Sequence, residues 1–171
     1  MLQKATLSDF PTLYALLEDS FPPDEYRPYE AQFALLSDPR YTLWTTKRKK
    51  ALISVWQFDR FAYIEHFAVD PACRNQGLGT QLLQEVLSAL PCPVCLEAEL
   101  PDSELTRRRL AFYQRNGFIC NVYPYIQPAY SPGRSPVPMQ ILSTPSALDH
   151  AQFRTVQDTL FQIVYKKSGR S

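Results

Sequence analysis

The sequence predicts an α/β (α+β) fold: a mixed, mostly antiparallel sheet of about seven strands flanked by helices. Strand-like runs rich in aromatic and β-branched residues follow one another closely between residues 41 and 69, as in antiparallel hairpins. Apolar residues recur at helical spacing before and after these runs. The chain has 171 residues, of which 45% are hydrophobic and 20% charged, which suits one domain with one core.

The first half of the chain begins with a short strand expected at residues 2–6. Ser8 can cap a following helix, which Pro22 and Pro23 end. A second helix is expected from about Pro28 to Leu36, because proline suits the first helical position. Three strands in a meander should follow, at residues 41–46, 51–58 and 61–69.

The second half alternates helix and strand before a final helix. A single domain, 1–171, is expected, with 143–171 as a C-terminal helical extension. The predicted helices span about residues 77–90, 102–116 and 147–165, and the predicted strands span residues 94–100, 119–126 and 138–142.

Charge and cysteine content argue against several functions. With 18 basic and 17 acidic residues the net charge is +1, so we expect no nucleic-acid or membrane partner. The sequence shows no secretory signal or membrane span, which favours a cytoplasmic protein. Cys92 and Cys95 form a single C-x-x-C pair without ligand-spaced histidines; we therefore expect reduced thiols and no metal.

The segment Arg74-Asn-Gln-Gly-Leu-Gly-Thr80 stands where a strand hands over to a helix. It contains two of the five glycines of the chain, which let a backbone approach a ligand closely. The first turn of a helix offers unpaired N–H groups and partial positive charge, so this is an expected anion site. Alone, the pattern also fits a helix start that merely contains glycines.

Two motifs resemble the GNAT superfamily of N-acetyltransferases. Phe61-Ala-Tyr-Ile-Glu-His-Phe-Ala-Val-Asp-Pro with the Arg74–Thr80 segment resembles its central motif. Leu110-Ala-Phe-Tyr-Gln-Arg-Asn-Gly-Phe118 resembles its second motif. The resemblance covers about residues 1–142 in element order and 61–118 in motif detail.

The resemblance implies acetyl-coenzyme A as co-substrate, bound where strand 61–69 splays from strand 94–100. Tyr113 matches the tyrosine whose hydroxyl lies near the thioester sulfur, whereas Thr106 replaces an asparagine frequent in the family. Backbone groups of one strand would bind the pantetheine arm, and main-chain N–H groups of the glycine-containing segment would hold the pyrophosphate. These cofactor residues are Phe67, Ala68 and Val69 on the strand, and Arg74, Asn75, Gln76, Gly77, Leu78, Gly79 and Thr80 in the segment.

Acyl transfer to an amine needs a proton acceptor and benefits from an acid at the leaving thiolate. Tyr113 suits the acid. Glu65 is a candidate base, directly or through water, since it is expected to share a strand face with Tyr63, Phe67 and Val69. Glu97 and Glu99 share a face of the next strand and can bind a cationic amine. Glu65 can equally be a glutamate at a polar sheet edge, and Glu97 and Glu99 can merely be solvated.

Two functions are compatible with the sequence. The first is an N-acetyltransferase that transfers acetyl from acetyl-coenzyme A to a primary amine of a small molecule or peptide by direct attack. The second is a non-catalytic acyl-coenzyme A-binding or interaction module with the same fold. The identity of the acceptor, the choice between Glu65 and a water chain as base, and the choice between monomer and homodimer stay open.

Overall fold

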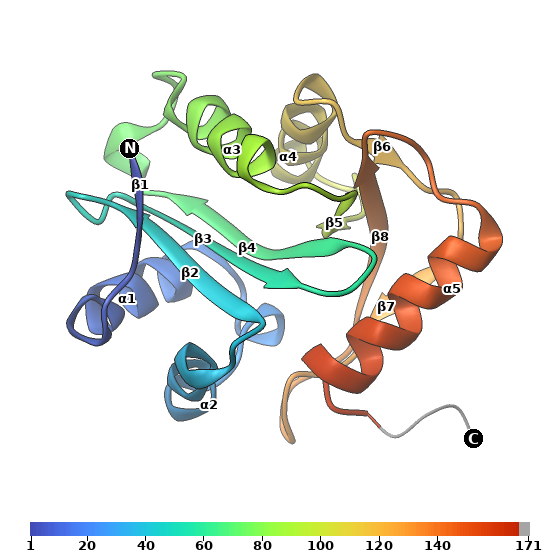
Figure 1. Cartoon of the computed structure of the whole chain (residues 1–171), viewed down its shortest axis with the longest axis horizontal. Helices are drawn as coiled ribbons and strands as arrows, with labels where there is room; N and C mark the ends of the chain where they lie inside the picture. Colours follow the sequence, from blue (N-terminus) through green and yellow to red (C-terminus); the bar gives the residue numbers. More distant parts are fainter. Residues whose placement is uncertain (168–171) are drawn as a thin grey trace. The chain divides into compact units, whose positions relative to one another are not determined.

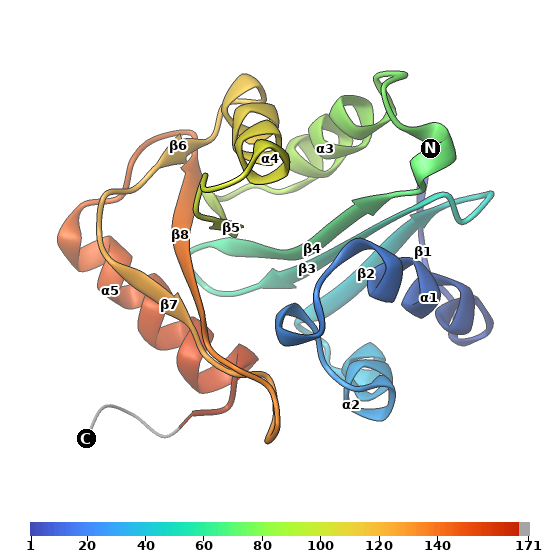
Figure 2. The same ribbon diagram turned by 180° about the vertical axis from the view of Figure 1, so that it is seen from behind.

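The computed structural model describes residues 1–167. Its internal contacts divide the chain into two compact units, Met1–Val94 and a second unit that begins at Cys95. Figures 1 and 2 show the chain from two opposite sides.

The first unit contains an antiparallel meander. In it β1 (Leu2–Lys4), β2 (Tyr41–Thr46), β3 (Ala51–Gln57) and β4 (Ala62–Val69) pair in chain order. The lysine-rich turn between β2 and β3 makes the tip of the expected hairpin. The predicted order of these strands is therefore confirmed.

Helices cover both faces of this meander. Figures 1 and 2 show α1 (Phe10–Ser20) and α2 (Tyr29–Ala34) on one face and α3 (Leu78–Ala89) on the other. The apolar residues of α1 are buried as its spacing predicts. Short 3₁₀ turns adjoin these helices at Leu7–Asp9, Pro23–Glu25, Leu35–Ser37 and Pro71–Cys73.

A β-bulge interrupts β4 at Glu65. Ile64 is opposite Val55 and His66 is opposite Ser54, so Glu65 is an extra residue with no partner position on β3. The Nδ1 of His66 lies 3.9 Å from Oε2 of Glu65, which places both side chains on one face. The expectation that Glu65 shares a face with Phe67 and Val69 is wrong, because the bulge reverses the alternation beyond it.

The second unit is built around β8 (Val137–Thr144), which pairs with three strands. Its neighbours are β5 (Val94–Glu99), β6 (Ile119–Cys120) and β7 (Tyr125–Gln127), the last two antiparallel. The helix α4 (Glu104–Arg115) follows β5. The C-terminal helix is confirmed as α5 (His150–Thr159), which continues as a π-helical turn at Leu160–Val164.

The predicted strand 119–126 is divided into β6 and β7. The side-chain amide of Asn121 donates to the Ile141 carbonyl and to Ser143 Oγ, and its oxygen accepts from the Leu148 N–H at 2.7 Å. Pro124 has no N–H for a strand ladder. The described residues therefore hold eight strands rather than about seven, and the mixed, mostly antiparallel α/β class is confirmed.

Candidate functional site

The segment after β4 is tied to the end of that strand. Asp70 Oδ1 accepts from the Ala72 N–H at 2.9 Å, and its other oxygen pairs with Lys50 Nζ at 2.9 Å. The Nε of Arg74 donates to the carbonyl of Val69, also at 2.9 Å. These contacts fix where the glycine-containing loop leaves the sheet.

Two residues of the loop have left-handed backbones. Asn75 has a φ of 60° and Gly77 a φ of 75°, a region that favours glycine and, more weakly, asparagine. Gly77 is the N-cap of α3, and its carbonyl accepts from the Gln81 N–H at 3.1 Å. The N–H groups of Leu78, Gly79 and Thr80 precede that bond, so they have no acceptor within the helix.

This loop fits an anionic ligand. Arg74 through Gly77 and Thr80 are exposed, while Leu78 and Gly79 are half-buried. A Cβ placed on Gly77 would meet no atom within 4 Å, so the space beside its backbone is open. The donors are backbone N–H groups at the positive end of a helix, which is the chemistry that pyrophosphate requires.

The three predicted pantetheine-binding residues end β4. Phe67, Ala68 and Val69 are opposite Ile53, Leu52 and Ala51 of β3, and they come directly after the bulge. Ala68 is buried and the other two are half-buried. The strand and the glycine-containing loop are therefore joined through only the 3₁₀ turn that begins at Pro71.

Tyr113 lies near the end of α4. Its ring contacts Phe112 and Phe118, with centroids 5.3 and 5.8 Å away. Burial raises the pKa of its phenol to about 12, although the nearby Arg109 guanidinium acts in the opposite direction. The hydroxyl consequently stays protonated at neutral pH and can act as a hydrogen-bond donor.

Thr106 has a local role at the start of the same helix. Its hydroxyl accepts from the Ser103 N–H at 3.0 Å, while Ser103 Oγ accepts from the Thr106 N–H at 3.1 Å. This is a capping box, and Thr106 is buried in it. The residue that stands in place of the family's frequent asparagine therefore stabilises its own helix.

The two glutamates of β5 have different surroundings. Glu99 is paired with Arg109, and both side chains are partly exposed. Glu97 accepts hydrogen bonds from two phenols, those of Tyr125 at 2.5 Å and Tyr165 at 2.7 Å. Sequence reasoning missed Tyr165, for which the only signal was its place at the end of an amphipathic C-terminal segment.

Glu65 lies in a buried ion pair that sequence reasoning also missed. Its Oε1 is 2.7 Å from Nη2 of Arg27, and the two side chains are 0% and 7% exposed. Burial tends to raise the pKa of this carboxyl, but Arg27 and hydrogen bonds outweigh it, so the pKa lies below its usual value. No pattern around Arg27, which stands between Tyr26 and Pro28, marks it as a partner.

Comparison with known proteins identifies the family. The model of the acetyltransferase (GNAT) family matches residues 10–118. This chain belongs to the GNAT family. The family uses acetyl-coenzyme A as co-substrate. The enzyme class predicted from the sequence, acyltransferase, is therefore confirmed.

Relatives of known sequence or structure agree with this assignment. A Bacteroides thetaiotaomicron protein provisionally named as a GNAT acetyltransferase is 34% identical, with a TM-score of 0.90 over 98% of this chain and 99% of that one. YjbC of Bacillus subtilis (strain 168), likewise provisionally named as an acetyltransferase, is 31% identical over 107 residues. That match spans 61% of this GNAT chain and 55% of YjbC, about half its length.

More distant structures share the fold. The ribosomal-protein-S18-alanine N-acetyltransferase of Escherichia coli has a TM-score of 0.65 at 20% identity, covering 87% of this chain and 95% of that one. A variant of the spermidine N-acetyltransferase SpeG of Vibrio cholerae has a TM-score of 0.61 at 13% identity, covering 84% and 93%. At these identities the likeness concerns the fold alone.

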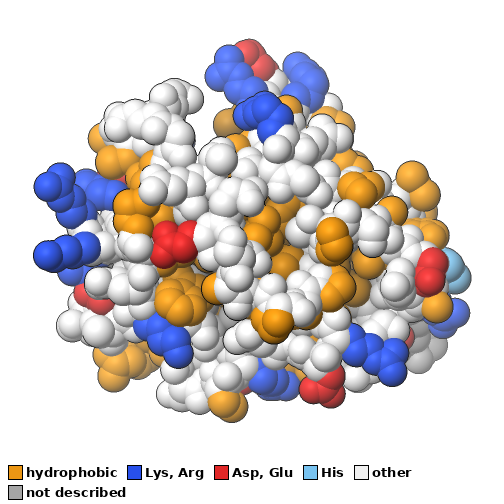
Figure 3. All heavy atoms as spheres, turned by 45° about the horizontal axis from the view of Figure 1, so that its top comes forward, with side chains coloured by type: hydrophobic (Ala, Val, Ile, Leu, Met, Phe, Trp, Pro, Cys, Tyr) orange, Lys and Arg blue, Asp and Glu red, His pale blue; other side chains and the backbone are white. Residues whose placement is uncertain are grey.

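Within residues 1–167 of this GNAT chain, no group of three or more His, Cys, Asp or Glu side chains is arranged to hold a metal ion. None of the helices described is both long and apolar enough to cross a membrane. On the face shown in Figure 3, the described Lys and Arg side chains are scattered and interspersed with acidic ones.

Proposed function

We propose that this chain transfers the acetyl group of acetyl-coenzyme A to a primary amine of a small molecule or a peptide. The observation that carries the proposal is the turn at Asn75 and Gly77, which opens α3 with backbone donors that have no acceptor within the helix, one 3₁₀ turn after β4. Arg74 through Thr80 would hold the pyrophosphate, and the backbone of Phe67, Ala68 and Val69 would hold the pantetheine arm.

The chemistry is a direct attack. The amine nitrogen bonds to the thioester carbon, the carbon–sulfur bond breaks, and the amine proton passes to solvent. Tyr113 would donate a hydrogen bond to the departing thiolate. Full proton transfer from a phenol with a pKa of about 12 to the thiolate of a thiol with a pKa of ~8.5 is uphill by roughly 5 kcal/mol. Tyr113 therefore acts mainly by stabilising the leaving sulfur.

The acceptor is proposed only by class. The distant structural relatives include enzymes named for spermidine and for a ribosomal-protein alanine, so polyamines and peptide N-termini are the first acceptors to test. Glu97 provides negative charge on β5 that would favour a cationic amine, whereas the charge of Glu99 is balanced by Arg109. The four cysteines are free thiols, which suits the proposed cytoplasmic location.

A thiol-release assay tests the proposal. Free coenzyme A is measured with acetyl-coenzyme A and a panel of polyamines, amino acids and alanine-initiated peptides, and product mass confirms acetylation of the amine. We expect acceptor-dependent release with at least one cationic amine. Coenzyme A binding without release from any acceptor would instead indicate the non-catalytic module.

A further inference from the structure

Glu65 and Arg27 form an ion pair in which both oxygens of the Glu65 carboxylate have a hydrogen-bond donor nearby. Arg27 Nη2 lies 2.7 Å from Oε1 of Glu65, and Trp56 Nε1 donates to Oε2 at 3.1 Å. His66 Nδ1 is 3.9 Å from the same Oε2. Both carboxylate oxygens therefore have donors from the protein itself.

These contacts meet at the bulge of β4. The His66 N–H lies in the irregular register beside Glu65 and donates to Ser54 Oγ at 3.0 Å. Ser54 and Trp56 are both buried residues of β3. The bulge is thus held by two side chains of the neighbouring strand and by Arg27, which comes from the segment between α1 and α2.

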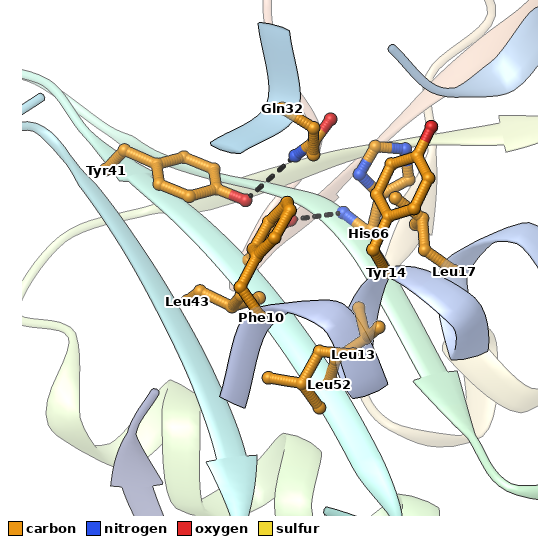
Figure 4. Close-up of a pocket in the computed structure, with 10 residues that line it drawn as sticks. Phe10, Leu13, Tyr14, Leu17, Gln32, Tyr41, Leu43, Leu52 and His66 are labelled. Atoms are coloured by element: carbon orange, nitrogen blue, oxygen red, sulfur yellow. Dashed lines mark hydrogen bonds between the residues drawn. The ribbon is translucent and has the colours of Figure 1, made fainter. Parts of the chain in front are cut away.

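The segment that supplies Arg27 is itself fixed at several points. The Tyr14 hydroxyl donates to the Arg27 carbonyl at 2.8 Å, and Arg27 Nη1 donates to Gln32 Oε1 at 3.2 Å. Gln32 in turn donates to the Tyr41 hydroxyl at 3.1 Å, a bond drawn beside the small cavity in Figure 4. His66 Nε2 lies 2.7 Å from the Glu25 carbonyl. These hydrogen bonds hold the segment in place, so the Arg27 guanidinium is positioned beside Glu65.

The bulge determines the direction in which the backbone groups of the following β4 residues, Phe67–Val69, point. With the extra residue, Phe67 is opposite Ile53, whereas a regular ladder continued from Ile64 and Val55 would put His66 there. A shift of one residue moves every N–H, carbonyl and side chain to the opposite side. The direction of the groups of Phe67–Val69 therefore depends on Glu65 staying out of the ladder.

We propose that Glu65 is a positioning residue: paired with Arg27, it holds the bulge that sets the Phe67–Val69 backbone for acetyl-coenzyme A, and exchanges no proton with the acceptor. This inference rests on the proposed function for the identity of the ligand. The lowered pKa of Glu65 agrees with it, because a carboxylate stabilised by Arg27 is a weak base.

Removal of the whole pair separates positioning from proton transfer. In Arg27→Met or Glu65→Leu, one buried charged group loses its partner, and we expect the Kd for coenzyme A to rise about 10-fold. In the double variant Arg27→Met/Glu65→Leu, apolar side chains of similar volume replace both, so the melting temperature should recover, whereas the Kd should stay raised about 10-fold because no ion pair holds the bulge. Calorimetry at a temperature where every variant is folded gives these values.

Turnover gives the second readout. At saturating acetyl-coenzyme A the double variant should retain turnover, with the same acidic limb as wild type in its kcat/KM profile against pH, because no proton passes through Glu65. The exposed pair Arg108–Glu104 on α4 is the matched control, and Arg108→Met/Glu104→Leu should change neither value. Glu65→Gln, which retains an oxygen for Arg27, should lie between wild type and Glu65→Leu.

Three results would overturn the inference. A double variant with normal coenzyme A affinity but more than about 100-fold lower kcat would make Glu65 a proton acceptor. Single or double variants with an unchanged Kd and kcat, whatever their melting temperature, would make the pair purely structural. A wild-type protein that binds no coenzyme A would remove the proposed function and this role with it, whereas the first two results leave that function intact.

Discussion

The hydroxyl of Tyr165 lies 2.8 Å from Oε1 and 2.7 Å from Oε2 of Glu97, although 68 positions separate the two residues in the sequence. Tyr165 follows the π-helical turn that ends α5, and Glu97 is in β5. Tyr165 also packs on Tyr130, with ring centroids 5.0 Å apart. The C-terminal segment, which lies outside the matched family region, therefore contributes to the surroundings of a predicted substrate-binding residue.

Tyr165→Phe should destabilise the protein. The change removes a part-buried hydrogen bond to a charged group, which typically contributes about 1.5–3 kcal/mol. Urea unfolding monitored by circular dichroism measures the difference. Tyr123→Phe, which loses a hydroxyl whose bond to the Leu148 carbonyl is 3.3 Å long, is the control and should cost clearly less. Equal stability of Tyr165→Phe and wild type would show that the hydrogen bond between Tyr165 and Glu97 does not stabilise the protein.

Glu97→Gln should raise the KM for a cationic acceptor about 10-fold, because it removes a negative charge while retaining the shape of the side chain. Initial rates at saturating acetyl-coenzyme A measure this effect. The control is Glu104→Gln, on the exposed surface of α4. An unchanged KM for Glu97→Gln would show that Glu97 serves only to hold Tyr125 and Tyr165.

Gly77→Ala should weaken coenzyme A binding about 5- to 10-fold. An alanine at a φ of 75° is strained by about 1 kcal/mol or more, and relief of that strain would turn the first-turn N–H groups away from the pyrophosphate. Gly133→Ala is a matched control, since Gly133 has a φ of 86° and equally open surroundings. It should lower stability to a similar extent and leave the coenzyme A affinity unchanged, as calorimetry would show.

Tyr113→Phe should lower kcat about 100-fold and leave the affinity for coenzyme A nearly unchanged. Steady-state kinetics and calorimetry on the same preparation separate the two effects. Because the pKa of Tyr113 is raised to about 12, its protonated form persists and is lost only as the pH rises through that value. Wild-type kcat should therefore show no decline from this group below about pH 10. A wild-type alkaline limb near pH 8–9 that Tyr113→Phe abolishes would contradict this assignment.

The stability of the protein should fall between pH 7 and pH 5 because of His66. Burial lowers the pKa of this imidazole, against the opposing effects of Glu65 and the Glu25 carbonyl. Below the unfolded pKa of about 6.5, the unfolded chain takes up a proton that the native state refuses, so stability is lost as the pH falls. The slope is at most about 1.4 kcal/mol per pH unit.

Two histidine variants check this pH dependence. Urea unfolding at pH 5, 6 and 7 should show a smaller slope for His66→Gln than for wild type. His150→Gln, at an exposed position that begins α5, should keep the wild-type slope. Equal slopes for all three proteins would exclude His66 as the source of the acid sensitivity.

The elements were readable from the sequence where their signals are local. The apolar spacing in α3 and the prolines before α2 act within one or two turns, and the predicted helices are present. The meander followed from strand-like runs joined by short turns. The backbone of the glycine-containing loop was likewise predictable, because glycines at a strand-to-helix junction determine the local backbone.

Features that depend on residues distant in the sequence could not be predicted from it. The bulge at Glu65 depends on Ser54 and Trp56 of β3 and on Arg27 before α2. The division of strand 119–126 depends on bonds between Asn121 and residues near positions 141 and 148. A periodicity argument assumes regular alternation, and these contacts break it.

The sequence by itself determined the family, the glycine-containing loop that opens α3 and the class of fold, because each rests on short-range patterns of residue type. Only the tertiary structure decided what the candidate side chains contact. It enclosed Glu65 with Arg27, paired Glu99 with Arg109 and brought Tyr165 to Glu97. A charged group's role depends on burial and partners, and these are set by which distant segments pack together.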